Sequence, residues 1–126
     1  MEKLDLKKRL SKLAFEVTQN SSTEPPNSGI YCDFYENGVY ICICCGNKLF
    51  SSKNKFNSKS GWPSFDSTIN DSAINFIEDL SYGMIRIEVS CKRCGSHLGH
   101  VFNDGPEPTG KRFCINSVSL KFEEDV

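Results

Sequence analysis

The sequence predicts a small, mainly β domain that carries an N-terminal helical arm and a zinc clamp. Three observations indicate this fold class: a chain of 126 residues, a helical pattern confined to its start, and two Cys-x-x-Cys-Gly motifs in the strand-like remainder. A chain of this length suffices for one domain and is short for two. We therefore expect a single domain over residues 1–126, made of a helical arm and loop (1–29) and a zinc-containing β core (30–122).

The helical arm is predicted between Asp5 and Gln19. Apolar residues recur there every three or four positions, which places them in one stripe along an α-helix. Asp5 is a candidate N-cap for this helix. A polar loop over 20–29, interrupted by Pro25 and Pro26, ends the arm. The stripe consists of Leu6, Leu10, Leu13, Ala14 and Val17.

The rest of the chain alternates between strand-like segments and loops. Strands are expected over 39–43, 82–89 and 112–122, where β-branched and aromatic residues are frequent or alternate with polar ones. Loops are expected over 60–64 and 103–110, which contain Gly and Pro. In the second strand, alternation separates Met84, Arg86 and Glu88 on one side from Ile85, Ile87 and Val89 on the other.

Composition and charge exclude several classes of partner. The net charge is −1 and the sequence pI is about 6.1, which argues against nucleic acid or a membrane surface. No apolar run approaches the length of a membrane helix, and residues 1–5 lack the apolar character of a signal peptide. We expect a cytoplasmic monomer. In that reducing compartment, seven cysteines favour metal and redox roles over disulfides.

The paired Cys-x-x-Cys-Gly motifs predict one zinc ion per chain. Two thiolates three residues apart can bind one ion from a tight turn, and the following glycine permits a positive φ. Four thiolates fill a tetrahedral shell, so the site is expected to be structural and not catalytic. The expected ligands are Cys42, Cys45, Cys91 and Cys94, which leaves Cys32, Cys44 and Cys114 for other roles.

The last predicted strand contains the candidate nucleophile, Cys114. Alternation places Arg112, Cys114 and Asn116 on one face of this strand and Phe113 on the other. Arg112 is expected to favour the thiolate and lower the thiol pKa, and Asn116 could donate a hydrogen bond to a reacting oxygen. The alternative is a buried cysteine in a core strand, which is common. The strand alone does not decide between the two.

Both histidines of the chain, His97 and His100, follow the second cysteine motif closely. One reading makes them metal ligands, but four cysteines already complete a zinc shell. The other reading is proton delivery to a substrate, because imidazole titrates near neutral pH. Asp104 lies four residues beyond His100 and could orient one ring.

Several longer motifs then point to one family. Gly61-Trp62-Pro63-Ser64-Phe65, the run from Cys94 to Phe102, Asp104-Gly105-Pro106 and the run from Pro108 to Ser117 are similar to the signature of the B-type methionine sulfoxide reductases. Residues 17–19 and 23–26 resemble the N-terminal segment of that family. The resemblance covers about residues 10–122, nearly the whole chain.

This resemblance implies a fold, a reaction and a set of site residues. The fold would contain two antiparallel sheets and a small helical part, and the reaction would reduce the R epimer of methionine sulfoxide, mainly in oxidised proteins. Cys114 would attack the sulfoxide sulfur and become a sulfenic acid. Trp62 would contact the substrate methyl group, and we also count Phe113 among the substrate-binding residues. The residues expected around the sulfoxide oxygen are His97, His100 and Asn116, supported by Arg112 and Asp104; which histidine is the acid stays open.

One departure from the family concerns regeneration of the thiol. Many members carry a recycling cysteine where this chain has Ser60, and a serine cannot form the required disulfide. Cys32, in the N-terminal loop region, is our expected substitute, with thioredoxin as the external reductant. Cys44 and direct reduction of the sulfenic acid by an external thiol remain the alternatives.

A function of another class also fits the cysteine motifs. Small β domains with two such motifs occur as binding modules without chemistry. A binding module needs its zinc and an exposed patch, and has no use for a thiol between Arg112 and Asn116. Turnover of methionine sulfoxide with a thiol reductant separates the two hypotheses.

Overall fold

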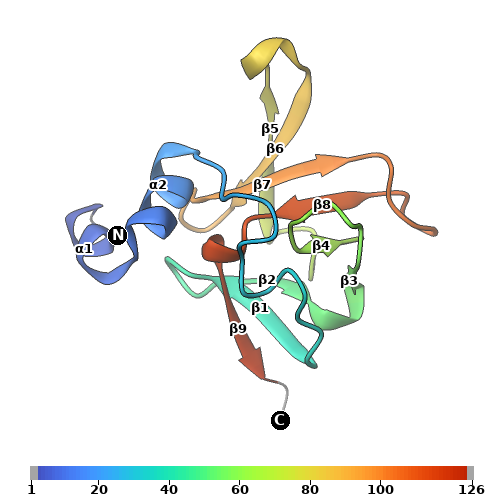
Figure 1. Cartoon of the computed structure of the whole chain (residues 1–126), viewed down its shortest axis with the longest axis horizontal. Helices are drawn as coiled ribbons and strands as arrows, with labels where there is room; N and C mark the ends of the chain where they lie inside the picture. The colour runs from blue at the N-terminus through green and yellow to red at the C-terminus, as the bar shows by residue number, and fades with distance from the viewer. Residues whose placement is uncertain (1–2, 125–126) are drawn as a thin grey trace.

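Two antiparallel sheets form the body of the molecule, which confirms the predicted fold class (Figure 1). The computed structural model describes residues 3–124; residues 1–2 and 125–126, the ends of the predicted domain, lie outside the described part. The three-stranded sheet has the order β2 (Lys48–Ser51), β1 (Gly38–Cys42) and β9 (Leu120–Glu124). The six-stranded sheet has the order β3 (Lys55–Phe56), β4 (Ser64–Phe65), β8 (Arg112–Ile115), β7 (His97–Phe102), β6 (Arg86–Cys91) and β5 (Ile74–Asp79).

The helical arm consists of two helices, and the prediction of one helix over 5–19 is wrong in this respect. α1 spans Lys3–Arg9 and α2 spans Lys12–Asn20. The second helix begins afresh because Ser11 caps it: the Ser11 hydroxyl accepts a hydrogen bond from the Ala14 amide at 3.1 Å. Asp5 lies inside α1. Among the described residues, neither helix is long and apolar enough to cross a membrane.

The strand predicted over 112–122 is divided between the two sheets. β8 ends at Ile115, a short 3-10 helix spans Ser117–Ser119, and β9 then joins the other sheet. The sequence pattern did not indicate this break, because apolar and polar residues alternate across it and it contains no Gly or Pro. Serine hydroxyls stabilise the turn instead: Ser117 accepts from the Tyr31 amide at 2.9 Å, and Ser119 donates to the His97 carbonyl at 3.0 Å.

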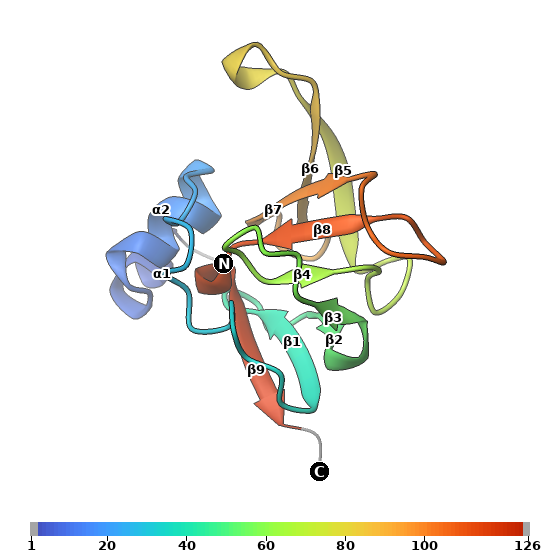
Figure 2. The same cartoon turned by 45° about the vertical axis from the view of Figure 1, so that its right-hand side comes forward.

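The β5–β6 hairpin (residues 74–91) projects from the body of the molecule (Figures 1 and 2). The prediction placed the start of the second strand at Tyr82, but β6 begins at Arg86. Tyr82 instead has a φ of 57° in the turn between the strands, and Ile85 is 82% exposed. The alternating pattern therefore extends beyond the edge of the core, to side chains such as Ile85 that pack against no second layer within residues 3–124.

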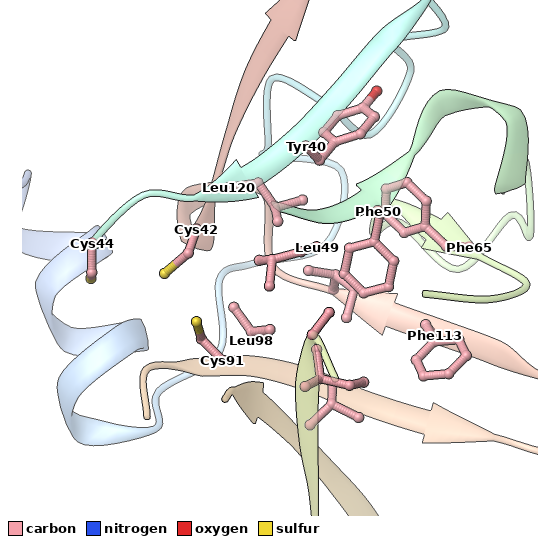
Figure 3. Packing of buried hydrophobic residues seen from close by; sticks show 14 of the residues in the cluster. Tyr40, Cys42, Cys44, Leu49, Phe50, Phe65, Cys91, Leu98, Phe113 and Leu120 are labelled. Atoms are coloured by element: carbon pink, nitrogen blue, oxygen red, sulfur yellow. The ribbon is translucent and has the colours of Figure 1, made fainter. Parts of the chain in front are cut away.

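The core lies between the two sheets and is rich in aromatic side chains (Figure 3). Phe50 from the three-stranded sheet stacks on Phe65 from the six-stranded sheet, with ring centroids 4.4 Å apart. Tyr40 packs edge-on against Phe65, and Phe113 lies 5.9 Å from Phe50. Such pairs contribute about 0.5–1.5 kcal/mol each beyond their buried area. The inner face of β8 is thereby occupied by core, which leaves its outer face for the site.

Candidate active site and metal centre

A pocket of about 290 Å³ opens on the outer face of β8. Alternation along β8 directs Phe113 and Ile115 into the core, so Arg112 and Cys114 face outward. Asn116 follows the strand and also lines the pocket. The predicted face of Arg112, Cys114 and Asn116 is thus present in the structure. The wall of the pocket also contains Ser60, Trp62 and His100.

Strand register gathers further polar residues beside Cys114. On the six-stranded sheet, Cys114 lies opposite His100 of β7, and His100 lies opposite Glu88 of β6. In the adjacent row, Arg112 lies opposite Phe102, and Arg86 pairs with Asp79 across the hairpin. Directly opposite residues share a face of the sheet.

A bulge brings both histidines to the same side of β7. His97 and His100 are three residues apart, and a regular strand would direct them to opposite faces. The register of β6 against β7 shifts between Val89 and Ser90, so that β7 accommodates one extra residue there. As a result the two imidazole rings lie 5.6 Å apart, while Leu98 between them is buried in the core.

Each histidine is held by a carboxylate of the β5–β6 hairpin. His97 Nδ1 lies 2.5 Å from Glu88 Oε2, and His100 Nε2 lies 2.8 Å from Asp79 Oδ2. Burial lowers the pKa of His97, and the Glu88 carboxylate opposes this shift without cancelling it. The suggestion that Asp104 orients a histidine is wrong. Asp104 is exposed and accepts two hydrogen bonds from Arg112, at 2.9 and 3.2 Å.

Burial raises the pKa of the Cys114 thiol above its ordinary value. Ser60, whose hydroxyl lies 3.9 Å from Cys114 Sγ, and Arg112 both act in the opposite direction. The prediction that Arg112 lowers this pKa has the right sign, although the net shift is upward because burial acts more strongly than Arg112 and Ser60 together. Loss of hydration destabilises a thiolate more than these two neighbours stabilise it. The site without substrate thus holds a protonated thiol at neutral pH.

A buried glutamate, Glu24, links the N-terminal segment to the pocket. Its amide donates to Asn116 Oδ1 at 3.0 Å, and its carbonyl accepts from Trp62 Nε1 at 3.0 Å. Its carboxylate accepts from the Val118 amide at 2.9 Å, and burial raises its pKa. Asn116 also donates to the Leu98 carbonyl at 3.0 Å. Glu24 therefore fixes Trp62 and Asn116 at the pocket.

Besides His97 and Asp104, three further residues considered in the sequence analysis lie outside this pocket. Phe113 is 5% exposed and faces the core, so the pocket offers it no direct contact with a substrate. Cys32 is half-buried in a neighbouring hollow of about 450 Å³ that shares Trp62 with the pocket. Cys44 is buried beside the helical arm, where it accepts a 3.6 Å hydrogen bond from Gln19 Nε2.

The four cysteines of the paired motifs converge on one point. Their sulfur atoms all lie within 4.8 Å of one another, with Cys42 to Cys94 at 3.6 Å and Cys45 to Cys91 at 3.5 Å. Tetrahedral thiolates at about 2.3 Å from a zinc ion would be about 3.8 Å apart, so the cluster fits a metal ion. Figure 3 shows Cys42 and Cys91 approaching each other from the two sheets. Both histidines bind carboxylates elsewhere, which argues against metal ligation by them.

Sequence reasoning did not identify Asp79, Glu88 or Glu24 as site residues. One signal was available, since alternation had already placed Arg86 and Glu88 on one side of a strand. Their relation to the histidines depended on strand pairing, which a single sequence does not reveal. Glu24 belonged to the segment that resembled the family but had no assigned role.

The geometry defines a class of protein first. A thiol in a pocket lined by an arginine and a histidine, together with a four-cysteine cluster that contributes no residue to that pocket, is the arrangement of a cysteine-dependent enzyme with a separate metal site. In such an enzyme the chemistry is expected at the thiol, because the four-cysteine cluster leaves no ligand position for a substrate.

Comparison with known proteins then identifies the family. The SelR domain matches residues 10–124. The peptide methionine sulfoxide reductase MsrB of Thioalkalivibrio sulfidiphilus is 56% identical over 118 residues, covering 94% of this chain and 86% of that protein. MsrB of Escherichia coli O139:H28 is 51% identical over 120 residues, covering 95% and 88%. The mitochondrial methionine-R-sulfoxide reductase B3 of Mus musculus is 53% identical over 118 residues, covering 94% of this chain and 47% of that protein. The chain belongs to the SelR family, the B-type peptide methionine sulfoxide reductases, which are oxidoreductases.

Proposed function

We propose that this chain reduces the R epimer of methionine sulfoxide to methionine, mainly in oxidised proteins, with Cys114 as the nucleophile. The observation that carries the proposal is the position of Cys114 in the pocket with His100, Arg112 and Trp62, in a chain of the SelR family. The printed names of the relatives specify methionine sulfoxide reduction for those proteins.

The reaction proceeds at sulfur. The Cys114 sulfur attacks the sulfoxide sulfur, and the sulfoxide oxygen gains a proton as its bond to the methionine sulfur breaks. The oxygen is transferred as a hydroxyl group to the Cys114 sulfur while the sulfur–sulfur bond formed by the attack breaks, so the products are methionine and a Cys114 sulfenic acid. Methionine sulfur is reduced by two electrons, and the cysteine sulfur is oxidised by two. Because the resting thiol is protonated, its own proton must leave as the attack begins.

His100 is the better placed of the two histidines to handle that proton. His100 lines the pocket of Cys114, whereas His97 lines only an adjoining hollow. Asp79 binds His100 through Nε2, which leaves Nδ1 as the ring nitrogen for a substrate. We assign His97 and Glu88 a positioning role behind His100. Arg112, fixed by Asp104, supplies a permanent positive charge at the sulfoxide oxygen.

Trp62 and Asn116 shape the place where the substrate binds. The Trp62 ring offers an apolar, electron-rich face to the methyl group next to the polarised sulfoxide. Asn116 has one amide hydrogen on the Leu98 carbonyl, which leaves the second for the sulfoxide oxygen. Phe113 supports the pocket from the core side and does not contact the substrate.

The reaction is tested with both epimers of an N-acetylated methionine sulfoxide amide and dithiothreitol as reductant. The wild-type chain is expected to reduce the R epimer only. Cys114→Ser is expected to lower this activity at least 1,000-fold, roughly the contribution of a covalent nucleophile. The melting temperature and the metal content of the variant should stay unchanged. Comparable turnover by Cys114→Ser, or turnover of the S epimer, would contradict the proposal.

Regeneration is assigned to Cys32 with thioredoxin as reductant. Cys32 lies in a hollow whose wall includes Trp62 of the active-site pocket. We expect a local movement of the 27–33 segment to bring its thiol to Cys114 during regeneration. Its thiol would displace the sulfenic oxygen as water and leave a Cys32–Cys114 disulfide, which a thioredoxin dithiol would reduce. Cys44 is less suitable because it is buried beside the metal cluster.

Peptide mapping after one turnover without reductant tests this assignment. The expected product is a Cys32–Cys114 disulfide. Cys32→Ser should keep dithiothreitol-driven turnover and lose at least tenfold with thioredoxin, because the intramolecular route is removed. Cys44→Ser serves as the matched control and should cycle normally. A Cys44–Cys114 disulfide, or normal thioredoxin cycling by Cys32→Ser, would refute the role of Cys32.

The remaining proposals concern the metal, the domain organisation and the location of the chain. We propose zinc as the metal of the four-cysteine cluster, because an all-thiolate tetrahedral set favours zinc and the closed shell gives it a structural function. We also propose a single domain over 1–126 that acts as a cytoplasmic monomer on oxidised proteins.

A further inference from the structure

Three serine hydroxyls form a chain that ends at the sulfur of Cys114. Ser64 of β4 lies opposite Cys114 of β8 in the strand register, so the two side chains share a face of the sheet. Ser58 and Ser60 belong to the loop between β3 and β4. Ser58 Oγ lies 2.6 Å from Ser64 Oγ and 2.8 Å from Ser60 Oγ. Ser60 Oγ in turn lies 3.9 Å from Cys114 Sγ, the reacting atom of the pocket.

The backbone around Ser60 is fixed on both sides. Lys59 and Gly61 have φ of 61° and 95°, so the chain makes a tight turn at this residue. The Gly61 carbonyl accepts a 2.7 Å hydrogen bond from the Asn27 amide, which ties the loop to the N-terminal segment. The Ser60 amide donates to Ser58 Oγ at 3.3 Å. These contacts give the Ser60 side chain a defined place at the pocket.

The Ser60 oxygen already accepts two hydrogen bonds. The Ser58 hydroxyl donates to it at 2.8 Å, and the Trp62 amide donates to it at 3.4 Å. A hydroxyl oxygen has two lone pairs, so both are occupied. Ser60 can make a further hydrogen bond only by donating its one hydrogen. It is therefore placed as a donor to Cys114 and not as a base that takes the thiol proton.

Two acceptors compete for the Ser60 hydrogen. The Trp62 carbonyl lies 3.4 Å from Ser60 Oγ, and Cys114 Sγ lies 3.9 Å from it. A thiol sulfur is a weak acceptor, whereas a hydrogen bond to an ionised acceptor is roughly twice as strong as one between neutral groups. The Ser64 hydrogen is shared between Ser58 and the Trp62 carbonyl, which is 3.2 Å away, so the carbonyl keeps a donor when Ser60 turns from it. Ionisation of Cys114 therefore shifts the competition toward the sulfur.

The charged and titratable groups around Cys114 do not supply this donor by themselves. Those that line the pocket or act on the thiol are Arg112 on β8, His100 on β7, Arg86 on β6 and Glu24 in the N-terminal segment. Burial raises the pKa of the Cys114 thiol most, and Glu24 raises it further, whereas Ser60 and Arg112 lower it. Both arginines are already paired with carboxylates. Ser60 is a donor whose hydrogen has no charged partner.

We propose that Ser60 is a catalytic residue whose hydroxyl turns from the Trp62 carbonyl to Cys114 Sγ as the thiol gives up its proton. The thiol proton goes to His100, and the Ser60 hydrogen stays on its own oxygen throughout. This hydrogen bond is strong only while the sulfur carries charge, so it stabilises the attacking thiolate more than the resting thiol. The inference rests on the proposed function and adds a residue to the same site. Position 60 thus has a chemical role although serine cannot form a disulfide.

Alkylation of Cys114 by iodoacetamide over a series of pH values tests the donor without a substrate. Ser60→Ala is expected to move the midpoint of the alkylation rate upward by about one pH unit, which makes the thiolate fraction at neutral pH about tenfold smaller. Well above both midpoints the two rates should converge, because all of the thiol is then ionised. Ser60→Thr keeps the hydroxyl and should restore the midpoint to within about 0.3 pH unit of wild type.

Single-turnover reduction of the R epimer at neutral pH provides the second readout. The rate at saturating substrate should fall roughly tenfold in Ser60→Ala, and the half-saturating concentration should stay within about twofold. Trp62 is the only tryptophan of the chain, so its fluorescence emission reports on the loop directly and should be unchanged. Ser72→Ala is the matched control, because the Ser72 hydroxyl bonds Asn70 at 3.0 Å in an exposed turn and should affect no readout.

The contrary outcomes are distinct. A lower rate in Ser60→Ala with an unchanged alkylation midpoint would assign Ser60 to support of Trp62 and overturn the inference. A midpoint that Ser60→Thr does not restore, or an alkylation deficit that persists at high pH, would overturn it as well. The alkylation series does not depend on sulfoxide reduction. A wild-type chain that reduces neither epimer would refute the proposed function, while the midpoints would still decide whether Ser60 donates to the thiolate.

Discussion

At the scale of single residues, the environment of Cys114 decides its chemistry. The side chain is half-buried, and loss of hydration raises the pKa of its thiol, whereas Ser60 and Arg112 lower it. A protonated thiol is less susceptible to oxidation than a thiolate, because the rate of oxidation rises with the thiolate fraction. Because burial and Arg112 act in opposite directions, the pKa of the Cys114 thiol depends on the charge of Arg112.

Removal of that cation should raise the thiol pKa further. In wild type, the rate of Cys114 alkylation by iodoacetamide should rise with a midpoint above the ordinary thiol pKa. In Arg112→Leu the midpoint should move to still higher pH, because the rate follows the thiolate fraction and a higher pKa requires a higher pH to reach it.

The measurement is mass-spectrometric quantification of the alkylated Cys114 peptide as a function of pH. Lys111→Leu is the matched control, since it removes a neighbouring cation whose ammonium binds Asn103 at 2.8 Å instead of facing the thiol. A midpoint that falls in Arg112→Leu, or moves equally in Lys111→Leu, would contradict the role of Arg112.

At the scale of elements, the bulge in β7 and the strand pairing of the hairpin bring two histidines and two carboxylates together. The bulge turns His97 to the side of His100, and β6 and β5 supply Glu88 and Asp79 to hold the two rings. A histidine that is fixed through one nitrogen presents the other in a defined direction. The hairpin therefore has a positioning role.

Glu88→Gln is expected to separate this positioning role from a purely structural one. Burial already lowers the pKa of His97, and the Glu88 carboxylate opposes that shift. Loss of the negative charge should lower the pKa of His97 further, so its midpoint in an NMR titration moves to lower pH. The rate constant kcat for the R epimer should fall roughly tenfold, part of the 10²–10⁴ that a positioned acid or base provides.

Glu78→Gln provides the control for this prediction. Glu78 lies on the same hairpin but opposite Ile87, on the other face of the sheet. Its replacement should leave both the His97 titration and kcat unchanged. An unchanged His97 midpoint in Glu88→Gln would show that the carboxylate does not stabilise the imidazolium.

At the scale of the whole molecule, the four-cysteine cluster joins the two sheets. Cys42 ends β1 of the three-stranded sheet, and Cys91 ends β6 of the six-stranded sheet. Gly46 and Gly95, which follow the two motifs, have φ of 80° and 77°, and each amide donates to the carbonyl of the first cysteine of its motif. A metal ion at this point restricts the unfolded chain as a cross-link does.

Loss of the metal should therefore destabilise the fold before it affects the chemistry. Cys45→Ser removes one ligand, and its melting temperature should fall by more than about 5 °C with loss of the bound ion. Cys44→Ser, at the adjacent position, should retain one ion per chain and most of the stability, because Cys44 is not part of the cluster. Metal analysis and calorimetry measure both effects; a metal-free Cys45→Ser protein of wild-type stability would contradict the structural role.

The sequence by itself determined the fold class, the four cysteines that cluster and the thiol that lies in the pocket. These depend on local patterns: the spacing of Cys42 and Cys45, the period-two alternation around Cys114, and the length of the motifs shared with a family. Such patterns are fixed by covalent spacing and backbone geometry, and therefore survive in a single sequence.

Only the tertiary structure decided the rest of the site. The division between β8 and β9, the pairing of Asp104 with Arg112, and the carboxylates on the two histidines all depend on which segments become neighbours. The raised pKa of Cys114 likewise depends on burial, which outweighs a nearby charge that alternation alone could identify. Burial and long-range contact are properties of the folded chain, because they arise only when distant segments exclude water together.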